Sequence, residues 1–399
     1  MKVPIPTQVS IINADSRNYW IDNLRGVITL LVVAHHAGLA YTTFAYFDAS
    51  RYISSTNPVV DSKRWLGVDI FVNFNDIFFM PLMFLISGLF VFGALKKKGT
   101  TRFLLDRIRR LGIPFLIGVT LIIPLAYIPS FHLAHHNFNL GAFIADYLGN
   151  EQWPVGPPWF IWLLLAFSCL STLLQLNIYE RIGVAATALA TRPAYLLICW
   201  FLVVSLSLIP MSLWLGQYTW TGIGPFDFQL NRAFFYFIFF LSGTVMGTFD
   251  WEARLFTGSR LLKKSWLFWT AMSLLSFALT EWLTFKGLMV LSGIGLSSLF
   301  SNFLSELVFV TTCIFTCLAL LNLFKSSINH TGLFWRSLSA NAYGIYLIHY
   351  VFVSWLQFAL LNADLTVLFK VITVFLISAP VSWWLVSQAR KIKLVAAII

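Results

Sequence analysis

Long apolar segments recur along the whole sequence, and short polar segments separate them. The apolar runs are about 18 to 24 residues long, which is enough for a helix to cross a hydrocarbon core of roughly 30 Å. A bilayer core offers no partners to open backbone groups, and these runs are too long for barrel strands, so each should be a helix. The pattern therefore predicts an all-α fold, a polytopic transmembrane helical bundle of about ten helices.

The predicted spans follow one another without a segment that would fold outside the membrane. They are Val27–Ala45, Ile70–Ala94, Ile113–Ser130, Pro158–Asn177, Ala194–Leu215, Asn231–Phe249, Trp266–Phe285, Phe303–Phe324, Leu338–Leu361 and Thr366–Ser387. No Gly/Ser-rich linker or polar segment of domain size interrupts them. Residues 1–399 are therefore expected to form one membrane domain with no appended soluble domain.

The distribution of Lys and Arg between the spans predicts the orientation of the chain. Alternate connecting segments sum to about 21 basic residues on one side and about 4 on the other, and the richer side should face the cytoplasm. Both termini and the segment Lys96–Arg110 are therefore expected to be cytoplasmic. Composition agrees with a membrane protein, with 58% hydrophobic residues, 11% charged residues and a mean hydropathy of +0.78. The formal charge of +11 reflects this one-sided bias, and no nucleic-acid motif accompanies it.

Polar side chains inside the spans are the candidates for function, because ionisable groups at membrane depth are costly unless they are paired or used. In the first span, Arg25 and His36 fall within about 20° of one helical face and lie roughly 16 Å apart along the axis. His35 points about 100° away. A phosphate-bearing ligand held at Arg25 would extend along this face to His36. The structural alternative is that the histidines bond neighbouring helices.

The second predicted span carries a polar face of its own. Asp69, Asn73, Asp76 and Ser87 all fall within about 40° of one helical face. Asp76 is expected within about two turns of the depth of His36. We therefore hypothesise that Asp76 or Asn73 orients His36 or hydrogen-bonds an acceptor.

Basic and aromatic residues elsewhere extend the candidate site. Arg107 and Arg110 precede the third span, where guanidinium groups suit a diphosphate, although lipid headgroups are the alternative ligand. Tyr346 and His349 enter the ninth span, and a mid-span histidine needs a partner. Glu281 lies near the outer end of its span and is a candidate to contact the substrate.

The longest outward segment, Phe131–Pro158, offers aromatic stacking to a sugar through Trp153, with an ordinary solvated loop as the alternative. It also holds His132, His135 and His136, but no partner stands at metal-ligand spacing. Cys313 and Cys317 lie one helical turn apart, and buried packing is expected for them. No metal site is predicted.

Five motifs in order resemble one family. They are LRGVITLLVVAHH, which holds Arg25 and His36; FLISGLF, which ends the second span; DRIRRLGIPF, which holds Arg107 and Arg110; PPWFIWLLLAF; and NAYGIYLIHY. Together they resemble the acyltransferase 3 family of integral membrane O-acyltransferases over nearly the whole chain. The spacing of the second span and the RIRRLGIPF junction is similar to the branch that contains periplasmic glucan succinyltransferases.

The resemblance implies a reaction. A short acyl group, acetyl or succinyl, would move from cytoplasmic acyl-CoA to a hydroxyl of a carbohydrate or lipid-linked acceptor at the outer face of a bacterial cytoplasmic (inner) membrane. By the family motif His36 would be the catalytic residue, while Arg25, Arg107 and Arg110 would surround the CoA phosphates. Acyl-CoA would be a cosubstrate and no cofactor would be bound.

Two questions stay open on the residues alone. His36 would act as a general base on the acceptor hydroxyl, or it would itself be acylated and relay the group across the membrane. Asn73 or Tyr346 would stabilise the oxyanion. The competing function is a transporter or flippase of a glycan or acylated metabolite, since charged groups at membrane depth also mark transport pathways. No internal repeat supports that alternative.

Overall fold

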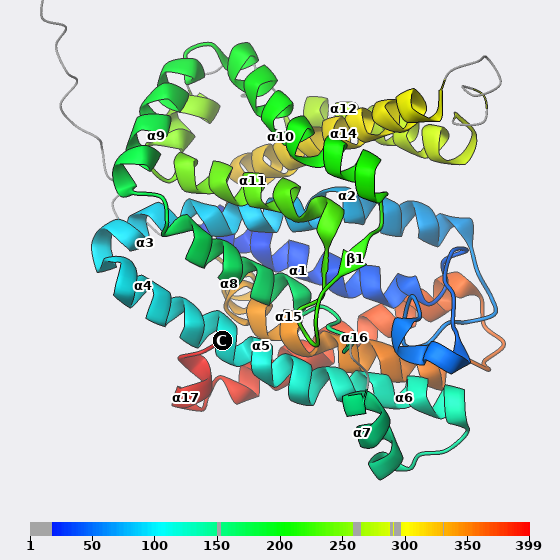
Figure 1. Ribbon diagram of the computed structural model, residues 1–399. Helices are drawn as coiled ribbons and strands as arrows, with labels where there is room; N and C mark the ends of the chain where they lie inside the picture. The colour runs from blue at the N-terminus through cyan, green and yellow to red at the C-terminus, as the bar shows by residue number, and fades with distance from the viewer. Residues whose placement is uncertain (1–17, 150–152, 258–264, 288–289, 291–296, 330) are drawn as a thin grey trace, which may run out of the picture.

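The computed structural model describes residues 18–149, 153–257, 265–287, 290, 297–329 and 331–399. Within these residues nearly all regular structure is helical, and Figure 1 shows helices packed side by side in a bundle. The one described sheet is a two-residue antiparallel pair, β1 (Trp220–Thr221) and β2 (Phe228–Gln229), with Trp220 opposite Gln229. The predicted all-α class is confirmed.

The helices follow the apolar segments of the sequence. In the first half of the chain they are α1 (Tyr19–Leu39), η1 (Ala49–Ser54), α2 (Leu66–Leu89), α3 (Val91–Lys98), α4 (Thr100–Arg107), η2 (Ile108–Gly112), α5 (Ile113–Ile117), η3 (Gly118–Ile122), α6 (Ile123–His135), α7 (Leu140–Gly149), α8 (Trp159–Ser171) and α9 (Leu176–Ala190). The second half contains α10 (Pro193–Leu215), α11 (Leu230–Met246), η4 (Glu252–Thr257), α12 (Trp266–Trp282), η5 (Leu283–Gly287), α14 (Ser298–Ser327), α15 (Leu333–Ala359), α16 (Val367–Ala389) and α17 (Lys393–Ala396).

Five helical segments are long and apolar enough to cross a membrane by themselves: Leu66–Lys98, Thr100–His135, Pro193–Leu215, Ser298–Ser327 and Val367–Ala389. The helices α8 and α9 meet at 97° and would add a sixth span if they count as one. These helices make the chain an integral membrane protein. The number ten and the cytoplasmic placement of both termini stay predictions, and residues 1–17 of the N-terminal segment lie outside the described residues.

Several segments differ from the pattern predicted along the chain. The predicted span Pro158–Asn177 is interrupted, because α8 ends at Ser171 and α9 begins at Leu176. The first helix ends at Leu39, where the chain turns, rather than continuing to Ala45. The outward segment Phe131–Pro158 is not a plain loop, because it contains the end of α6 and the whole of α7. Apolar residues of α7 pack onto α6, which explains why this segment folds: Phe143 contacts Phe131 with ring centroids 5.5 Å apart.

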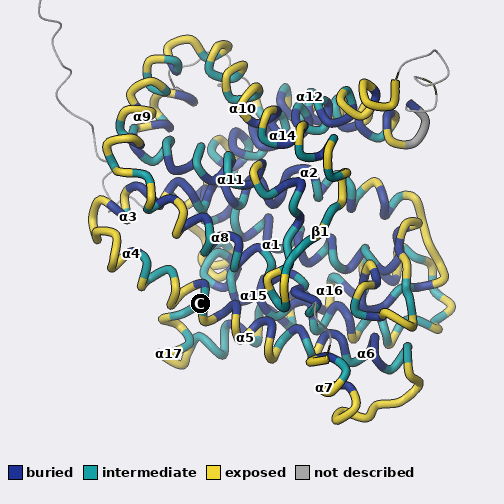
Figure 2. The backbone as a smooth tube through the Cα atoms, viewed as in Figure 1, coloured by how far each residue is buried: buried dark blue, intermediate teal, exposed yellow. Residues whose placement is uncertain are grey.

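Burial separates the inner helices of the bundle from the outer ones. The most apolar window of Leu66–Lys98 is 72% buried, whereas those of α10 and α16 are 28% buried. In Figure 2 the yellow, exposed positions gather on the outer helices, and α1 runs through the dark interior. The helix α1 packs against α2, α14, α15 and α16. The helix α1, which carries His35 and His36, is thus enclosed by other helices.

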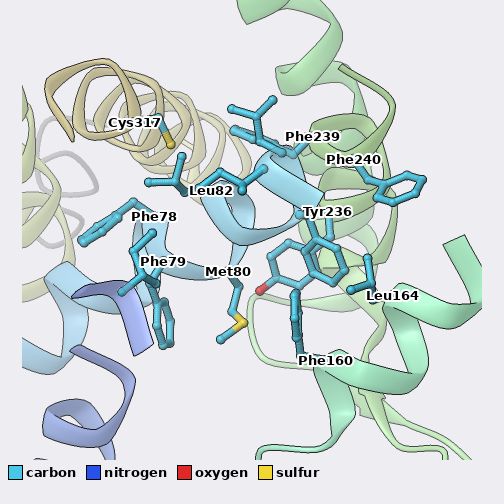
Figure 3. Close-up of a cluster of buried hydrophobic side chains, with 14 of the residues drawn as sticks. Phe78, Phe79, Met80, Leu82, Phe160, Leu164, Tyr236, Phe239, Phe240 and Cys317 are labelled. Atoms are coloured by element: carbon cyan, nitrogen blue, oxygen red, sulfur yellow. The ribbon is translucent and has the colours of Figure 1, made fainter. Parts of the chain in front are cut away.

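The core of the bundle is aromatic. Figure 3 shows Phe78, Met80, Phe160, Tyr236 and Phe240 converging from α2, α8 and α11. All of them are nearly inaccessible to solvent. Such a core fixes α2, the polar helix predicted to face His36, against its neighbours.

Small residues let α2 and α11 approach closely. A Cβ atom built on Gly243 would lie 2.0 Å from the Leu85 carbonyl oxygen, and one on Gly88 would lie 2.1 Å from the Phe240 carbonyl oxygen. Gly247, one turn after Gly243, faces the Leu89 carbonyl in the same way. This spacing of small residues is typical of helix pairs in membranes, where close backbone packing replaces the hydrophobic effect.

A buried ion pair fastens the segment after α1 to α16. Lys370 Nζ lies 2.6 Å from Asp61 Oδ2, and both side chains are at most 2% exposed. Nearby, Tyr52 donates to Asp146 Oδ2 at 2.7 Å. Burial and this carboxylate raise the pKa of the Tyr52 hydroxyl, so it remains a donor. These contacts close the bundle over the end of α1 that carries the histidines.

Candidate active site

The centre of the candidate site is a pair of histidines from α1 and α15. His36 Nδ1 lies 3.3 Å from His349 Nε2, and the ring centroids are 5.1 Å apart. The Tyr350 ring stands edge-on to the His36 ring, also with centroids 5.1 Å apart. His349 is fully buried and His36 is half-buried. The sequence placed polar residues of both α2 and α15 near His36. The residue that contacts His36 is His349, from α15.

The contacts of the two rings assign their hydrogens. His349 Nδ1 lies 2.7 Å from the Tyr346 carbonyl oxygen, which can only accept, so Nδ1 carries the hydrogen and Nε2 presents a lone pair. His36 Nδ1 lies 2.8 Å from the Val32 carbonyl oxygen and faces that lone pair as well. Both neighbours accept, so the hydrogen of neutral His36 is on Nδ1. Its Nε2 keeps the lone pair and has no hydrogen-bond partner among the described residues.

A buried amide chain holds the backbone of α1 at this point. Gln357 Nε2 donates to the His36 carbonyl at 2.9 Å and to the Ala37 carbonyl at 3.2 Å. Asn57 Nδ2 donates to Gln357 Oε1 at 2.9 Å, and the Tyr350 hydroxyl donates to Asn57 Oδ1 at 3.3 Å. The chain therefore closes on Tyr350, whose ring touches His36. Gln357 and Asn57 are each 1% exposed.

Sequence reasoning missed both amide residues. Gln357 had a signal, because it lies seven residues after Tyr350 and hence on the same face of a membrane helix, where an uncharged polar group still needs a partner. Asn57 had none, since it lies in a polar connecting segment among many similar residues.

His35, which precedes His36 in the chain, points toward a different helix, as the helical spacing predicted. His35 is buried against α2, and its ring centroid lies 5.1 Å from that of Phe79. Its ring also stands edge-on to the His36 ring, with centroids 5.4 Å apart, but among the described residues no hydrogen bond joins it to His349.

The three predicted phosphate-binding arginines line one cavity. Arg25, Arg107 and Arg110 surround a space of ≈ 470 Å³ together with residues of α2, α8 and α15. Its volume falls in the range of small-molecule sites. We call the end of the bundle that holds these arginines the basic end. The Arg25 guanidinium is also 3.8 Å from Asp22, and Arg107 stacks on Phe103 at 5.0 Å.

The cavity extends from the basic end toward the histidines. Thr29 and Tyr346 line it. Thr29 lies two helical turns before His36 on the same face, and the Tyr346 ring centroid is 6.1 Å from that of His349. The Tyr346 hydroxyl donates to the Pro157 carbonyl, which ties α15 to the start of α8.

The polar face of α2 forms a second cluster instead of contacting His36. Asp76 Oδ2 lies 2.6 Å from Arg232 Nη1, and Asn73 Nδ2 donates to Glu281 Oε1 at 3.3 Å. The contact of Asp76 or Asn73 with His36 that was hypothesised from depth alone is not formed among the described residues. The physical reason is that Arg232, buried in α11, offers Asp76 a full opposite charge.

This second cluster lines a small polar pocket, which lies away from the basic end that holds Arg25, Arg107 and Arg110. It has a volume of ≈ 60 Å³, and Asn73, Asp76, Arg232, Glu281 and Glu306 are among its lining residues. The predicted substrate residues are thus divided. Glu281 belongs to this pocket, whereas Tyr346 and His349 belong to the histidine site.

Trp153 lies in a third place. Its ring centroid is 5.8 Å from that of Tyr147, and its backbone N–H donates to the Gly224 carbonyl at 3.2 Å. It packs on the aromatic cluster that also contains Tyr350, whose ring contacts His36.

The described residues contain no group of three or more His, Cys, Asp or Glu that could hold a metal ion. Cys313 and Cys317 are free and buried, whereas Cys169 and Cys199 are free and exposed.

The basic cavity reaches Tyr346, one helical turn before His349, and its three arginines suit an anionic ligand. Comparison with known proteins gives the class: the model of an acyltransferase domain matches residues 18–387. The chain belongs to the acyltransferase 3 family.

Its curated relatives include the glucans biosynthesis protein C of several Salmonella strains. That of Salmonella heidelberg is 26% identical over 263 residues, which cover 61% of this chain and 62% of the relative. Those of Salmonella paratyphi B and Salmonella enteritidis are each 25% identical over the same length and coverage. The chain thus aligns with less than two thirds of the length of these relatives. No solved structure matches it.

Proposed function

We propose that this protein transfers a short acyl group, acetyl or succinyl, from acyl-CoA to a hydroxyl of a carbohydrate or lipid-linked glycan, with His36 as the general base. The observation that supports this most is the free Nε2 of His36, beyond the inner reach of a cavity lined by Arg25, Arg107 and Arg110. The relatives' name, glucans biosynthesis protein C, supports a carbohydrate acceptor.

The arginines would bind the phosphates of acyl-CoA. Guanidinium groups bind phosphate through paired, charge-assisted hydrogen bonds, and three of them at one mouth suit a ligand with several phosphates. Arg25 and His36 are separated by roughly 16 Å along α1. The thin arm of CoA would run past Thr29 and Tyr346 and bring the thioester to the histidines.

At the histidines, the acceptor hydroxyl would donate its proton to His36 Nε2 while its oxygen attacks the thioester carbonyl carbon. The C–S bond then breaks, the ester forms, and the thiolate of CoA leaves and takes the proton from His36. During attack His36 is positive, and its Nδ1–H is shared between the Val32 carbonyl oxygen at 2.8 Å and the His349 lone pair at 3.3 Å. A positioned base of this kind contributes typically 10²- to 10⁴-fold in rate.

The acceptor would approach from the end opposite the arginines. There the second polar cluster, with Asn73, Asp76 and Glu281, offers hydrogen bonds, and Trp153 offers an aromatic face for a sugar. In this arrangement Asp76 and Asn73 serve the acceptor rather than His36.

The sidedness of this reaction follows the charge bias of the loops. The basic end would face the cytoplasm, where acyl-CoA is made, and both termini with it. About ten helices of one domain would cross a bacterial inner membrane.

The proposal is tested with purified protein in liposomes, given radiolabelled acetyl-CoA or succinyl-CoA and a panel of glucans and lipid-linked glycans. Label should appear in an acceptor as an alkali-labile ester. An acid quench in the absence of acceptor should find no label on the protein, because direct attack forms no acyl-enzyme. Labelled protein would instead support the histidine relay, and movement of an acceptor across the membrane without label transfer would support the flippase.

A further inference from the structure

A deep apolar groove opens on the side of the bundle away from the donor cavity. It has a volume of ≈ 390 Å³ and lies between α9, α10, α11 and α14, in the upper part of Figure 1. Its few polar groups are satisfied: the Ser242 hydroxyl donates to the Ile238 carbonyl at 2.7 Å and accepts from Trp200 Nε1 at 3.0 Å. The groove therefore offers a ligand only apolar contact.

The groove runs from the membrane-facing surface into the core. Its rim includes Ile182 and Val203, which are 46% and 48% exposed, and its floor includes Leu85 and Leu318, which are 2% and 5% exposed. It exists because α10 covers the bundle loosely. Leu85 lines the groove while Ile86, on another face of α2, lines the donor cavity, so the two spaces are separate.

Three arginines lie close in the chain to lining residues, on α9, on η4 and just before α10, and α9 packs against both η4 and α10. Arg181 precedes the lining residue Ile182, Arg192 stands one helical turn before the lining residue Leu196, and Arg254 precedes the lining residue Leu255. These three arginines are exposed, and no ion pair is recorded for them among the described residues.

The two glutamates on the same segments already have partners. Glu180 pairs with Lys96 at 3.0 Å, and Glu252 pairs with Lys325 at 3.3 Å. Asp250, four residues before Arg254, is exposed and has no recorded ion pair among the described residues, so the three arginines outnumber the free acids here. The end of the groove near these arginines is also the basic end of the bundle. The end of α11 packs here against the end of α2, where Gly247 faces the Leu89 carbonyl, and the neighbouring residues Ser87 and Phe90 line the donor cavity.

We propose that the groove binds one acyl chain of an anionic glycerophospholipid, whose phosphate lies against Arg181, Arg192 and Arg254. Hydrocarbon is the ligand chemistry that a wholly apolar groove in a membrane selects. The arginines add a preference for a negative headgroup, because basic side chains at a membrane surface attract anionic lipids. This lipid site goes beyond the transfer reaction and does not depend on it.

The test uses Trp200, which lines the groove, as a fluorescent reporter. Full-length protein is placed in phosphatidylcholine vesicles that contain a minor fraction of brominated phosphatidylglycerol or, at the same fraction, brominated phosphatidylcholine. The fluorescence of Trp200 is obtained by subtracting the fluorescence of W200F from that of the wild-type protein. Brominated phosphatidylglycerol should quench this signal at a mole fraction at least about fivefold lower than brominated phosphatidylcholine, which is the factor that a single basic residue at the membrane surface contributes.

Variants decide whether the groove and its arginines cause the preference. R181Q/R192Q/R254Q should remove it, while the matched triple variant R51Q/R102Q/R336Q, which alters exposed arginines elsewhere, should keep it. A186F narrows the groove and should reduce quenching by both lipids. Equal quenching by the two lipids in the wild-type protein, or quenching unaffected by A186F, would overturn the proposal. The proposal would also be overturned if a polyprenyl phosphate displaced the brominated phosphatidylglycerol and unlabelled phosphatidylglycerol did not, because the groove would then select a different lipid.

Discussion

Replacing His349 tests whether the second histidine acts through the first. His349→Leu removes the lone pair that faces His36 Nδ1 at 3.3 Å, in a position that is fully buried and cannot be filled by bulk water. Leucine also fills most of the space, so packing against Tyr350 should survive.

The size of the effect follows from the contact that is lost. A hydrogen bond to a charged group contributes about 1.5 to 3 kcal/mol, and His36 is charged only while it holds the proton of the acceptor hydroxyl. Since about 1.4 kcal/mol corresponds to tenfold in rate, loss of the whole bond would lower kcat roughly 10- to 150-fold. The Val32 carbonyl still accepts from Nδ1–H in this variant, so that range is the upper limit of the effect. The KM for acyl-CoA should change little, because His349 does not line the donor cavity.

The assay is initial-rate transfer of the acyl group from acyl-CoA in liposomes, with H349Q as the matched variant. The glutamine carbonyl oxygen can accept from His36 Nδ1–H, so H349Q should recover part of the rate that H349L loses. Equal loss in both variants, or a loss that appears in KM while kcat is unchanged, would refute the idea that His349 stabilises the charged form of His36.

Three other perturbations have defined outcomes. Lys370→Met leaves Asp61 buried without its cation, so unfolding by denaturant should be easier by about 3 to 5 kcal/mol, and K370M/D61L should recover most of this loss if the pair is the cause. Gly243→Ala inserts a methyl group against the Leu85 carbonyl and should lower the thermal unfolding midpoint, whereas Gly93→Ala, with open space around it in α3, should not lower it and should raise it slightly through the helix propensity of alanine. Arg107→Gln should raise the Kd for CoA, measured by calorimetry, by tenfold or more through the loss of a charge-assisted contact, and an unchanged Kd would remove Arg107 from the donor site.

The helices, and the shared face of Arg25 and His36 on α1, could be predicted from the sequence because they depend on local periodicity. A run of apolar residues predicts a span whatever it packs against, and eleven residues of helix fix the angle between Arg25 and His36. The same arithmetic separated His35 from His36, and the structure places their rings against different helices.

The partners of these side chains were not accessible, because they depend on which helices pack together. Depth along α2 suggested that Asp76 meets His36, but Arg232 from α11 takes the carboxylate. The partner of His36 is His349, 313 residues away in the chain, and no local pattern encodes that pairing. The end of α1 at Leu39 was missed because the apolar run continues after the helix has turned.

The central claim is that His36 Nε2 removes the proton of the acceptor hydroxyl. The most direct measurement compares H36A with H35A, two substitutions at adjacent positions of α1, for both acyl transfer and CoA binding in the same liposomes. The account predicts that H36A abolishes transfer while its Kd for CoA stays that of the wild-type protein, and that H35A retains transfer. Transfer by H36A at a rate near that of the wild-type protein would contradict the claim.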